Sequence, residues 1–168
     1  MNTAVFFGST NGNTSDAAGK IAKLLDAKTF DVGKLKSADE LLNYDMLILG
    51  TSTWYDGELQ DDWESFISLL KATDLSGKVV ALFGLGDQEG YGSDFVSGMR
   101  QIYDAALACG AKVIGSWEDV GYSYDNSASV IGGKFIGLAL DEDNQSELSD
   151  ERIATWCSQL KSELQKAS

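Results

Sequence analysis

Continuous apolar runs alternate with amphipathic segments along most of this chain. The runs are not interrupted by polar residues at every second position, which is typical of strands covered on both faces, as in a parallel sheet. They predict five strands, at Thr3–Phe7, Lys28–Val32, Met46–Gly50, Val79–Phe83 and Ala111–Ile114.

The segments between the runs carry apolar residues three and four positions apart. This spacing predicts helices that place one face against a sheet. Ser149 is expected to cap the last helix, and Ser37 with Glu40 fits a capping box for a short helix before Asp45. The four longer helices are predicted at Asn13–Ala27, Asp61–Lys71, Ser93–Cys109 and Ser149–Gln165.

The regular alternation of strands and helices predicts an α/β fold, a doubly wound parallel sheet with helices on both faces. Glu118–Lys134 breaks the alternation, because it has no helical pattern and lies between the apolar stretches Ala111–Trp117 and Phe135–Leu140. We interpret it as an insertion within the last strand. The length of 168 residues predicts one domain over residues 1–168.

Composition narrows the function classes. Asp and Glu number 26 against 13 Lys and Arg, a net charge of −13 that disfavours nucleic acid and anionic membranes and favours basic proteins as partners. Histidine is absent, which excludes His-based catalytic triads and metal sites with histidine ligands. Cys109 and Cys157 form no CxxC motif, and neither a signal peptide nor a membrane span is evident, so we expect reduced thiols and a cytoplasmic protein.

Three loops of unusual composition follow the carboxyl ends of predicted strands, where ligands bind in open α/β sheets. The first, Gly8–Thr14, reads GSTNGNT and precedes a helix. Its hydroxyls, amides and backbone N–H groups favour a phosphate held without a basic residue. Its spacing fits neither a Walker A loop nor the GxGxxG fingerprint of dinucleotide sites. An ordinary capped turn is the alternative.

The other two loops, Gly50–Leu59 and Gly84–Asp94, each carry an aromatic residue in a turn, Trp54 and Tyr91 respectively. Trp54 could instead fold back onto the core. Taken together, a neutral phosphate loop and two aromatic loops at one sheet edge favour a flat aromatic mononucleotide, with Trp54 and Tyr91 stacked on its two faces.

Four motifs carry a specific resemblance, and they span most of the chain: FFGSTNGNT, GTSTWYDGELQDDW, FGLGDQEGYGSDF and GKFIGLALDEDNQ. The sequence resembles the long-chain flavodoxins. The resemblance implies a five-stranded parallel sheet in the order 2-1-3-4-5, non-covalently bound FMN, and an insertion inside the fifth strand. Asn11 stands where this family usually has threonine, and Tyr55-Asp56 stands where some relatives have glycine.

The resemblance also implies roles for individual residues. Trp54 and Tyr91 would cover the two faces of the isoalloxazine ring, and Asp94 and Asp143 would reach the ribityl chain or the pyrimidine edge. The FMN phosphate would be held by Ser9, Thr10, Asn11, Gly12, Asn13 and Thr14. The backbone of Tyr55, Asp56 and Gly57 would lie near flavin N5, and backbone groups of Leu85, Gly86 and Asp87 would bind the pyrimidine edge. Ser52 and Thr53 are also expected to bind the cofactor.

The function implied is that of a low-potential one-electron carrier rather than an enzyme. Such a carrier would use the semiquinone/hydroquinone couple of FMN to link a reductase, such as a ferredoxin/flavodoxin–NADP reductase, to iron–sulfur or haem enzymes. Acidic residues around the flavin would steer this monomer onto basic partner surfaces. The alternatives are a flavodoxin-like NAD(P)H-dependent quinone reductase, a phosphoacceptor receiver, and a scaffold protein without a cofactor.

Overall fold

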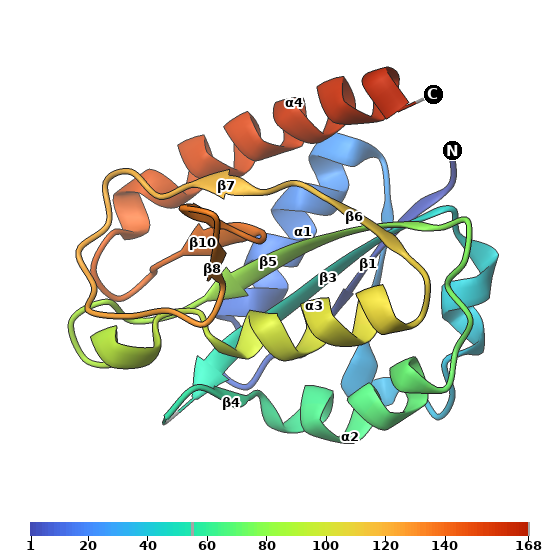
Figure 1. The fold of residues 1–168 in the computed structure, drawn as a ribbon, viewed down its shortest axis with the longest axis horizontal. Coiled ribbons are helices and arrows are strands. Elements are labelled where there is room, and N and C mark those ends of the chain that lie inside the picture. Colours follow the sequence, from blue (N-terminus) through green and yellow to red (C-terminus); the bar gives the residue numbers. More distant parts are fainter. Residues whose placement is uncertain (55, 168) are drawn as a thin grey trace.

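A parallel sheet runs through the centre of the molecule in this computed structural model, which describes residues 1–54 and 56–167 (Figure 1). Its strands follow the order β2-β1-β3-β5, and β6 and β10 both pair with β5. β6 and β10 are the two halves of one interrupted strand, and counting them as one gives the predicted order 2-1-3-4-5. The bounds are β1 Thr3–Phe7, β2 Lys28–Asp31, β3 Met46–Trp54, β5 Val79–Leu85, β6 Lys112–Ile114 and β10 Leu138–Leu140.

The last strand is interrupted, as predicted. β6 pairs with the first half of β5, and β10 pairs with the second half. The chain between them forms a separate antiparallel sheet in the order β7-β9-β8. Its strands are β7 Trp117–Glu118, β8 Val130–Ile131 and β9 Lys134–Phe135. The part of the chain that leaves the parallel sheet is therefore residues 115–137.

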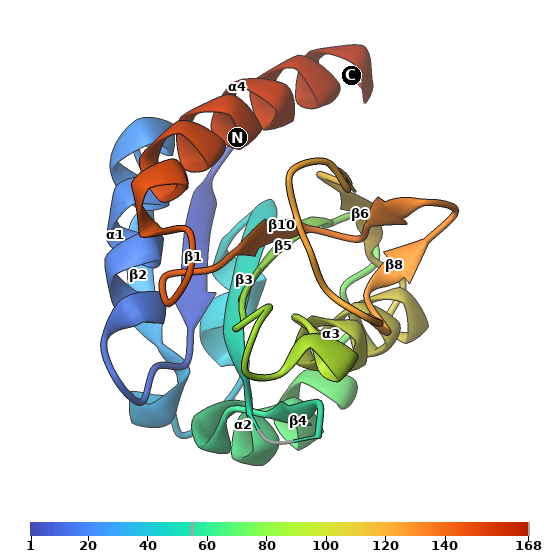
Figure 2. The ribbon, with the colours of Figure 1, turned by 90° about the vertical axis from the view of Figure 1, so that its left-hand side faces the viewer.

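Helices cover both faces of the sheet (Figure 2). α1 (Asn13–Leu25) and α4 (Ser149–Ala167) pack side by side on one face, where Ile21, Trp156 and Ile48 of β3 belong to one buried cluster. α2 (Asp61–Lys71) and α3 (Gly98–Ala108) cover the other face. Because both faces are buried, the strands carry the continuous apolar runs seen in the sequence.

Two elements differ from the sequence prediction near the ends of the central strands. β3 continues past Gly50 to Trp54, because Thr51 and Ser52 still pair with β5 and β4 (Glu58–Leu59) pairs antiparallel with Thr53 and Trp54. α3 begins at Gly98 rather than Ser93. Its predicted first turns are replaced by a short 3₁₀ turn and by Val96, whose φ of 49° is left-handed and ends any helix there.

The two predicted serine caps are also wrong. Ser149 already has helical angles, φ −62° and ψ −44°, and its buried hydroxyl has no hydrogen-bond partner among the described residues. The Ser37 hydroxyl accepts from the N–H of Asp39, while Glu40 bonds to the Asn43 amide, so no capping box forms. The short helix is a 3₁₀ turn, Asp39–Asn43.

The other boundaries move by a few residues. α1 ends at Leu25 because Asp26 is left-handed, with φ 52°. β2 ends at Asp31, whose side chain caps a 3₁₀ turn by accepting from the N–H of Gly33. α4 continues beyond Gln165. In the described part of the chain, no helix combines the length and apolar character needed to cross a membrane.

Tyr122 fastens the insertion to the sheet. Its hydroxyl accepts a hydrogen bond from Trp117 Nε1 (2.8 Å) and donates one to the backbone carbonyl of Ala139 in β10 (2.6 Å). The Arg152 guanidinium lies over its ring, 4.1 Å from the centroid. Burial raises the pKa of Tyr122 to about 12, despite the opposing charge of Arg152.

We expect Tyr122→Phe to lower the free energy of unfolding by about 1–3 kcal/mol at pH 7, because it removes the hydrogen-bond partner of two partly buried polar groups. The folded state holds the phenol proton more tightly than the unfolded chain, where the pKa is about 10. This proton-linked stability is complete below pH 10 and is lost as the pH rises towards 12. Urea unfolding at pH 7 and pH 11 should therefore show a smaller difference between variant and wild type at pH 11.

Candidate functional site

A cleft of about 250 Å³ opens at the carboxyl ends of the central strands. The three predicted loops all contribute to it, together with the segment after β10. Ten of its eleven lining residues were expected from the sequence. The lining comprises Asn11, Asn13, Ser52, Thr53, Trp54, Leu85, Gly86, Asp87, Tyr91, Glu142 and Asp143. Among these described residues there is no lysine or arginine.

The first loop forms a tight turn at the start of α1. Gly12 has φ 92°, and no atom lies within 4 Å of the position that a Cβ would take there, so the space beside it is open. Its N–H donates to the Ser9 hydroxyl (3.1 Å). The Thr14 hydroxyl is buried and has no partner among the described residues. An orphaned buried hydroxyl at a helix N-terminus is what a phosphate group would satisfy.

Gln60, which was not predicted to take part, contacts this loop. It is buried, its Oε1 accepts from the N–H groups of Asp62 and Trp63, and its Nε2 donates to the Thr10 hydroxyl (3.1 Å). A Cβ on Gly8 would lie 2.2 Å from Gln60 Oε1, so only glycine fits there. The sequence signal for Gln60 was its position directly before α2, where the side chain can cap the helix.

Trp54 and Tyr91 line the cleft from different loops. Trp54 is half-buried rather than folded into the core, and its Nε1 donates to the Ser52 hydroxyl (2.8 Å). Tyr91 is 52% exposed. Thr53 accepts from the N–H of Gly98 at the start of α3 (2.9 Å), which fixes the end of β3. Tyr55, also predicted to take part, lies outside the described residues.

Seven predicted residues do not line the cleft. Ser9, Thr10, Gly12 and Thr14 belong to the first loop and the start of α1, where the Ser9 hydroxyl accepts from the N–H of Gly12 and the Thr10 hydroxyl accepts from Gln60. The other three are Asp56, Gly57 and Asp94. A Cβ on Gly57 would lie 3.2 Å from Asp94 Oδ1, so Asp94 approaches the Gly57 turn instead.

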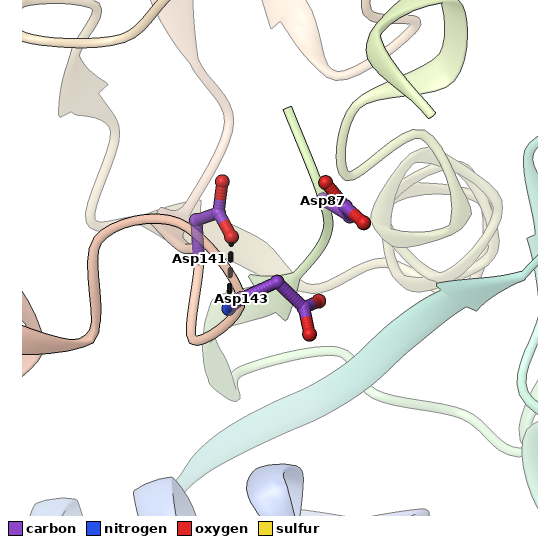
Figure 3. Close-up of side chains that lie close together, drawn as sticks. All are labelled: Asp87, Asp141 and Asp143. Atoms are coloured by element: carbon purple, nitrogen blue, oxygen red, sulfur yellow. Dashed lines mark hydrogen bonds between the residues drawn. The ribbon is translucent and has the colours of Figure 1, made fainter. Parts of the chain in front are cut away.

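Asp87 faces the segment after β10 from the third loop (Figure 3). Its Oδ1 accepts from the N–H groups of Glu89 and Gly90 and from the Asn144 amide (3.1, 2.8 and 2.8 Å). The Gly90 N–H is the main reason that the pKa of Asp87 is lowered. Asp87 therefore stays ionised while closing its own turn.

Asp141 is fully buried at the end of β10. Its two carboxylate oxygens accept five hydrogen bonds, from the N–H groups of Asp143, Asn144 and Gln88 and from the Asn144 and Gln88 side chains. One of these bonds is drawn in Figure 3. Oxygens of Asp87, Asp141 and Asp143 lie within 4.8 Å of one another. The charge of Asp141 is thus balanced by polar donors of the two loops.

Asp143 is the exposed member of this group and lines the cleft. Partial burial raises its pKa, and the neighbouring charges of Asp87, Asp141 and Glu142 raise it further. Glu142 lines the cleft beside it and was not predicted, although the run Asp141–Asp143 directly after a strand end was a visible signal. The cleft therefore combines neutral amide and hydroxyl side chains with carboxylates.

The fold and the cleft are those of a doubly wound α/β protein with a ligand site at the carboxyl edge of its sheet. The flavodoxin family model matches residues 5–156, so the chain belongs to the flavodoxin family. It is 44% identical to flavodoxin 2 of Salmonella typhi over 98% of this chain and 97% of that protein. It is 43% identical to the flavodoxin of Synechocystis over 96% of each.

A solved structure extends the likeness to the fold. The crystal structure of Fusobacterium nucleatum flavodoxin bound to flavin mononucleotide superimposes with a TM-score of 0.91. The two chains are 36% identical, and the match covers 96% of this chain and 98% of that one.

Proposed function

We propose that this protein is an FMN-dependent one-electron carrier and not an enzyme. The observation that carries the proposal is the buried Thr14 hydroxyl without a partner, at the N-terminus of α1 and next to the open space at Gly12. Two aromatic residues line the adjoining cleft. Family membership and the FMN-bound relative support the same cofactor.

The phosphate end of FMN would be bound by the first loop. Thr14 supplies its free hydroxyl, and backbone N–H groups at the start of α1 supply further donors along the helix dipole. Asn11 and Asn13 line the cleft beside them. Ser9 and Thr10 shape the loop through their bonds to Gly12 and Gln60. No basic residue of the described cleft would neutralise the phosphate, which therefore keeps its charge.

The ring of FMN would lie between Trp54 and Tyr91, with Leu85, Gly86 and Asp87 along its edge. The bond from Trp54 to Ser52 holds the indole at the cleft wall before the ring arrives. Asp143 reaches the cleft from the opposite loop. Tyr55, Asp56 and Gly57 would contribute backbone groups near the ring, with Asp94 supporting the Gly57 turn.

Bound FMN supplies the electron-accepting and electron-donating chemistry. The chain's own contribution is electrostatic, because Asp87, Glu142 and Asp143 line the same cleft and carry negative charge. Negative charge near the ring disfavours the addition of a further electron, and the effect is stronger where burial lowers the local dielectric. These carboxylates would therefore hold the potential of the cofactor low.

Redox partners with basic surfaces would dock where the cleft opens, since the net charge is −13 and several carboxylates surround the opening. A ferredoxin/flavodoxin–NADP reductase and low-potential acceptor enzymes are partners of this kind. The same charge opposes self-association, which supports a monomer. The proposed site of action is the cytoplasm.

Stepwise anaerobic reduction of the FMN-loaded protein tests this function. We expect two resolved one-electron steps in the visible spectrum, and slow NADPH oxidation unless a reductase is added. A single two-electron step with rapid NADPH oxidation by the protein alone would instead identify a quinone reductase. Failure to bind FMN would overturn the proposal altogether.

A further inference from the structure

A buried glutamine joins three segments that are far apart in the sequence. Gln88 is 5% exposed and follows directly after the cleft residue Asp87. Its backbone N–H and its Nε2 both donate to Oδ2 of Asp141 (3.1 and 2.8 Å), and Nε2 also donates to Oε1 of Gln145 (2.8 Å). Its Oε1 accepts from the backbone N–H of Ser123. Every polar atom of this side chain is therefore engaged.

The three segments are two walls of the cleft and the insertion. Residues 85–91 carry Asp87 and Tyr91, and residues 141–145 carry Glu142 and Asp143. Ser123 belongs to the stretch between β7 and β8, which makes no part of the cleft lining. Gln88 is thus a side chain that contacts the insertion and both walls at once, while Gln145 of the second wall also donates to the Gly121 carbonyl of the insertion (2.8 Å).

The insertion also holds the Tyr91 loop by its backbone. The N–H groups of Asp125 and Asn126 donate to the carbonyl of Gly92 (2.8 and 3.0 Å), and the N–H of Phe95 donates to the carbonyl of Asn126 (3.1 Å). These bonds hold the chain just after Tyr91, while the bonds of Gln88 hold the chain just before it. The position of Tyr91 is consequently determined from both ends.

Burial makes the Gln88 contacts strong determinants of geometry. Asp141 is a buried carboxylate, and such a charge is tolerated only when donors surround it. Gln88 is the partner of Asp141 that comes from outside the Asp141 segment, and together with the bond from Asn144 to Asp87 it helps to set the distance between the two walls. The phosphate loop has no part in this network, because its bonds run to Gln60 and within itself.

We infer that Gln88 is a positioning residue for the ring of the cofactor, and that the insertion acts on the ring site through it. The inference rests on the proposed FMN function. It assigns the insertion a defined task, which is to hold the Tyr91 and Asp143 walls at the spacing that an isoalloxazine ring requires. The network should govern binding of the ring and not binding of the phosphate.

The test separates the two ends of the site by using riboflavin, which lacks the phosphate, and inorganic phosphate, which lacks the ring. Both are titrated into full-length protein freed of flavin. Gln88→Met keeps the length of the side chain but removes its donors and acceptor. Gln101→Met, on the exposed face of α3, is the matched control. Urea unfolding establishes that each variant is folded.

We expect Gln88→Met to bind riboflavin about tenfold more weakly and phosphate within about twofold of wild type, with Gln101→Met unchanged for both. Unchanged riboflavin binding in folded Gln88→Met would overturn the inference, and so would an equal loss for the two ligands. After either of these outcomes the proposed function still stands, provided that the wild-type protein binds FMN. If the wild-type protein binds no FMN, the proposed function and the inference about Gln88 both fail.

A second pair of variants decides the matter if Gln88→Met does not fold. Ser123→Pro removes the N–H that Gln88 accepts, and Ser123→Ala keeps it, while the Ser123 side chain itself is exposed. We expect Ser123→Pro to weaken riboflavin binding at least threefold with phosphate binding unchanged, and Ser123→Ala to match wild type. Riboflavin binding by Ser123→Pro equal to that of Ser123→Ala would overturn the inference.

Discussion

Replacing Thr14 by valine is expected to weaken FMN binding by about 10- to 100-fold without lowering the stability of the flavin-free protein. The hydroxyl is buried and makes no hydrogen bond to the described residues, so the isosteric change removes no internal contact. A hydrogen bond to a charged phosphate contributes about 1.5–3 kcal/mol, and each 1.4 kcal/mol is a tenfold change in affinity.

Quenching of FMN fluorescence measures this effect, and riboflavin is the internal comparison. Thr14→Val should bind riboflavin as wild type does, because that ligand has no phosphate. Thr29→Val, at an exposed position of β2, is the control for the chemical change. An equal loss of affinity for both flavins would show that Thr14 shapes the ring site rather than binding the phosphate.

Gly50→Ala is expected to lower the free energy of unfolding by about 3 kcal/mol, at the upper end of overpacking effects. Gly50 lies in β3, which pairs with β1 on one side and β5 on the other. An added Cβ would fall 2.0 Å from Cζ of Phe83 and within 2.4 Å of both neighbouring ring atoms. Phe83 is fully buried in β5, so its ring cannot move aside without disturbing the core.

Urea unfolding at neutral pH measures the loss. Gly19→Ala is the matched control, because Gly19 lies within α1 with nothing within 4 Å of the added carbon. There the same substitution should stabilise the protein by about 0.5–1 kcal/mol, through the better helix propensity of alanine. Wild-type stability of Gly50→Ala would contradict the close packing of the Phe83 ring against β3.

The local pattern of apolar and polar residues was sufficient to predict much of the fold. α2 begins and ends where predicted, at Asp61 and Lys71, because its apolar residues repeat at helical spacing and its first turn is acidic. The strand runs were found for a similar reason, since burial on both faces leaves an unbroken apolar signal. The cleft was predicted from the same strands, because parallel strands bring their carboxyl ends to one edge.

The remainder depends on contacts between distant residues. The start of α3 is set at Val96, whose carbonyl accepts from the hydroxyl of Ser129 in the insertion (2.7 Å). β3 is lengthened by pairing with the end of β5 and with β4. Gln88 and Asp141 meet although they are separated by 53 positions. No short-range pattern indicates any of these contacts, so a single sequence could not supply them.

The split of the last strand has a consequence for the order in which the chain assembles. β6 reaches β5 after one crossover through α3, whereas β10 must return to β5 across the whole insertion as well. Closing the longer loop costs more chain entropy before any contact compensates for it. We therefore expect the sheet to form through β6 first, and the wall of the cleft that carries Asp143 to form late in folding.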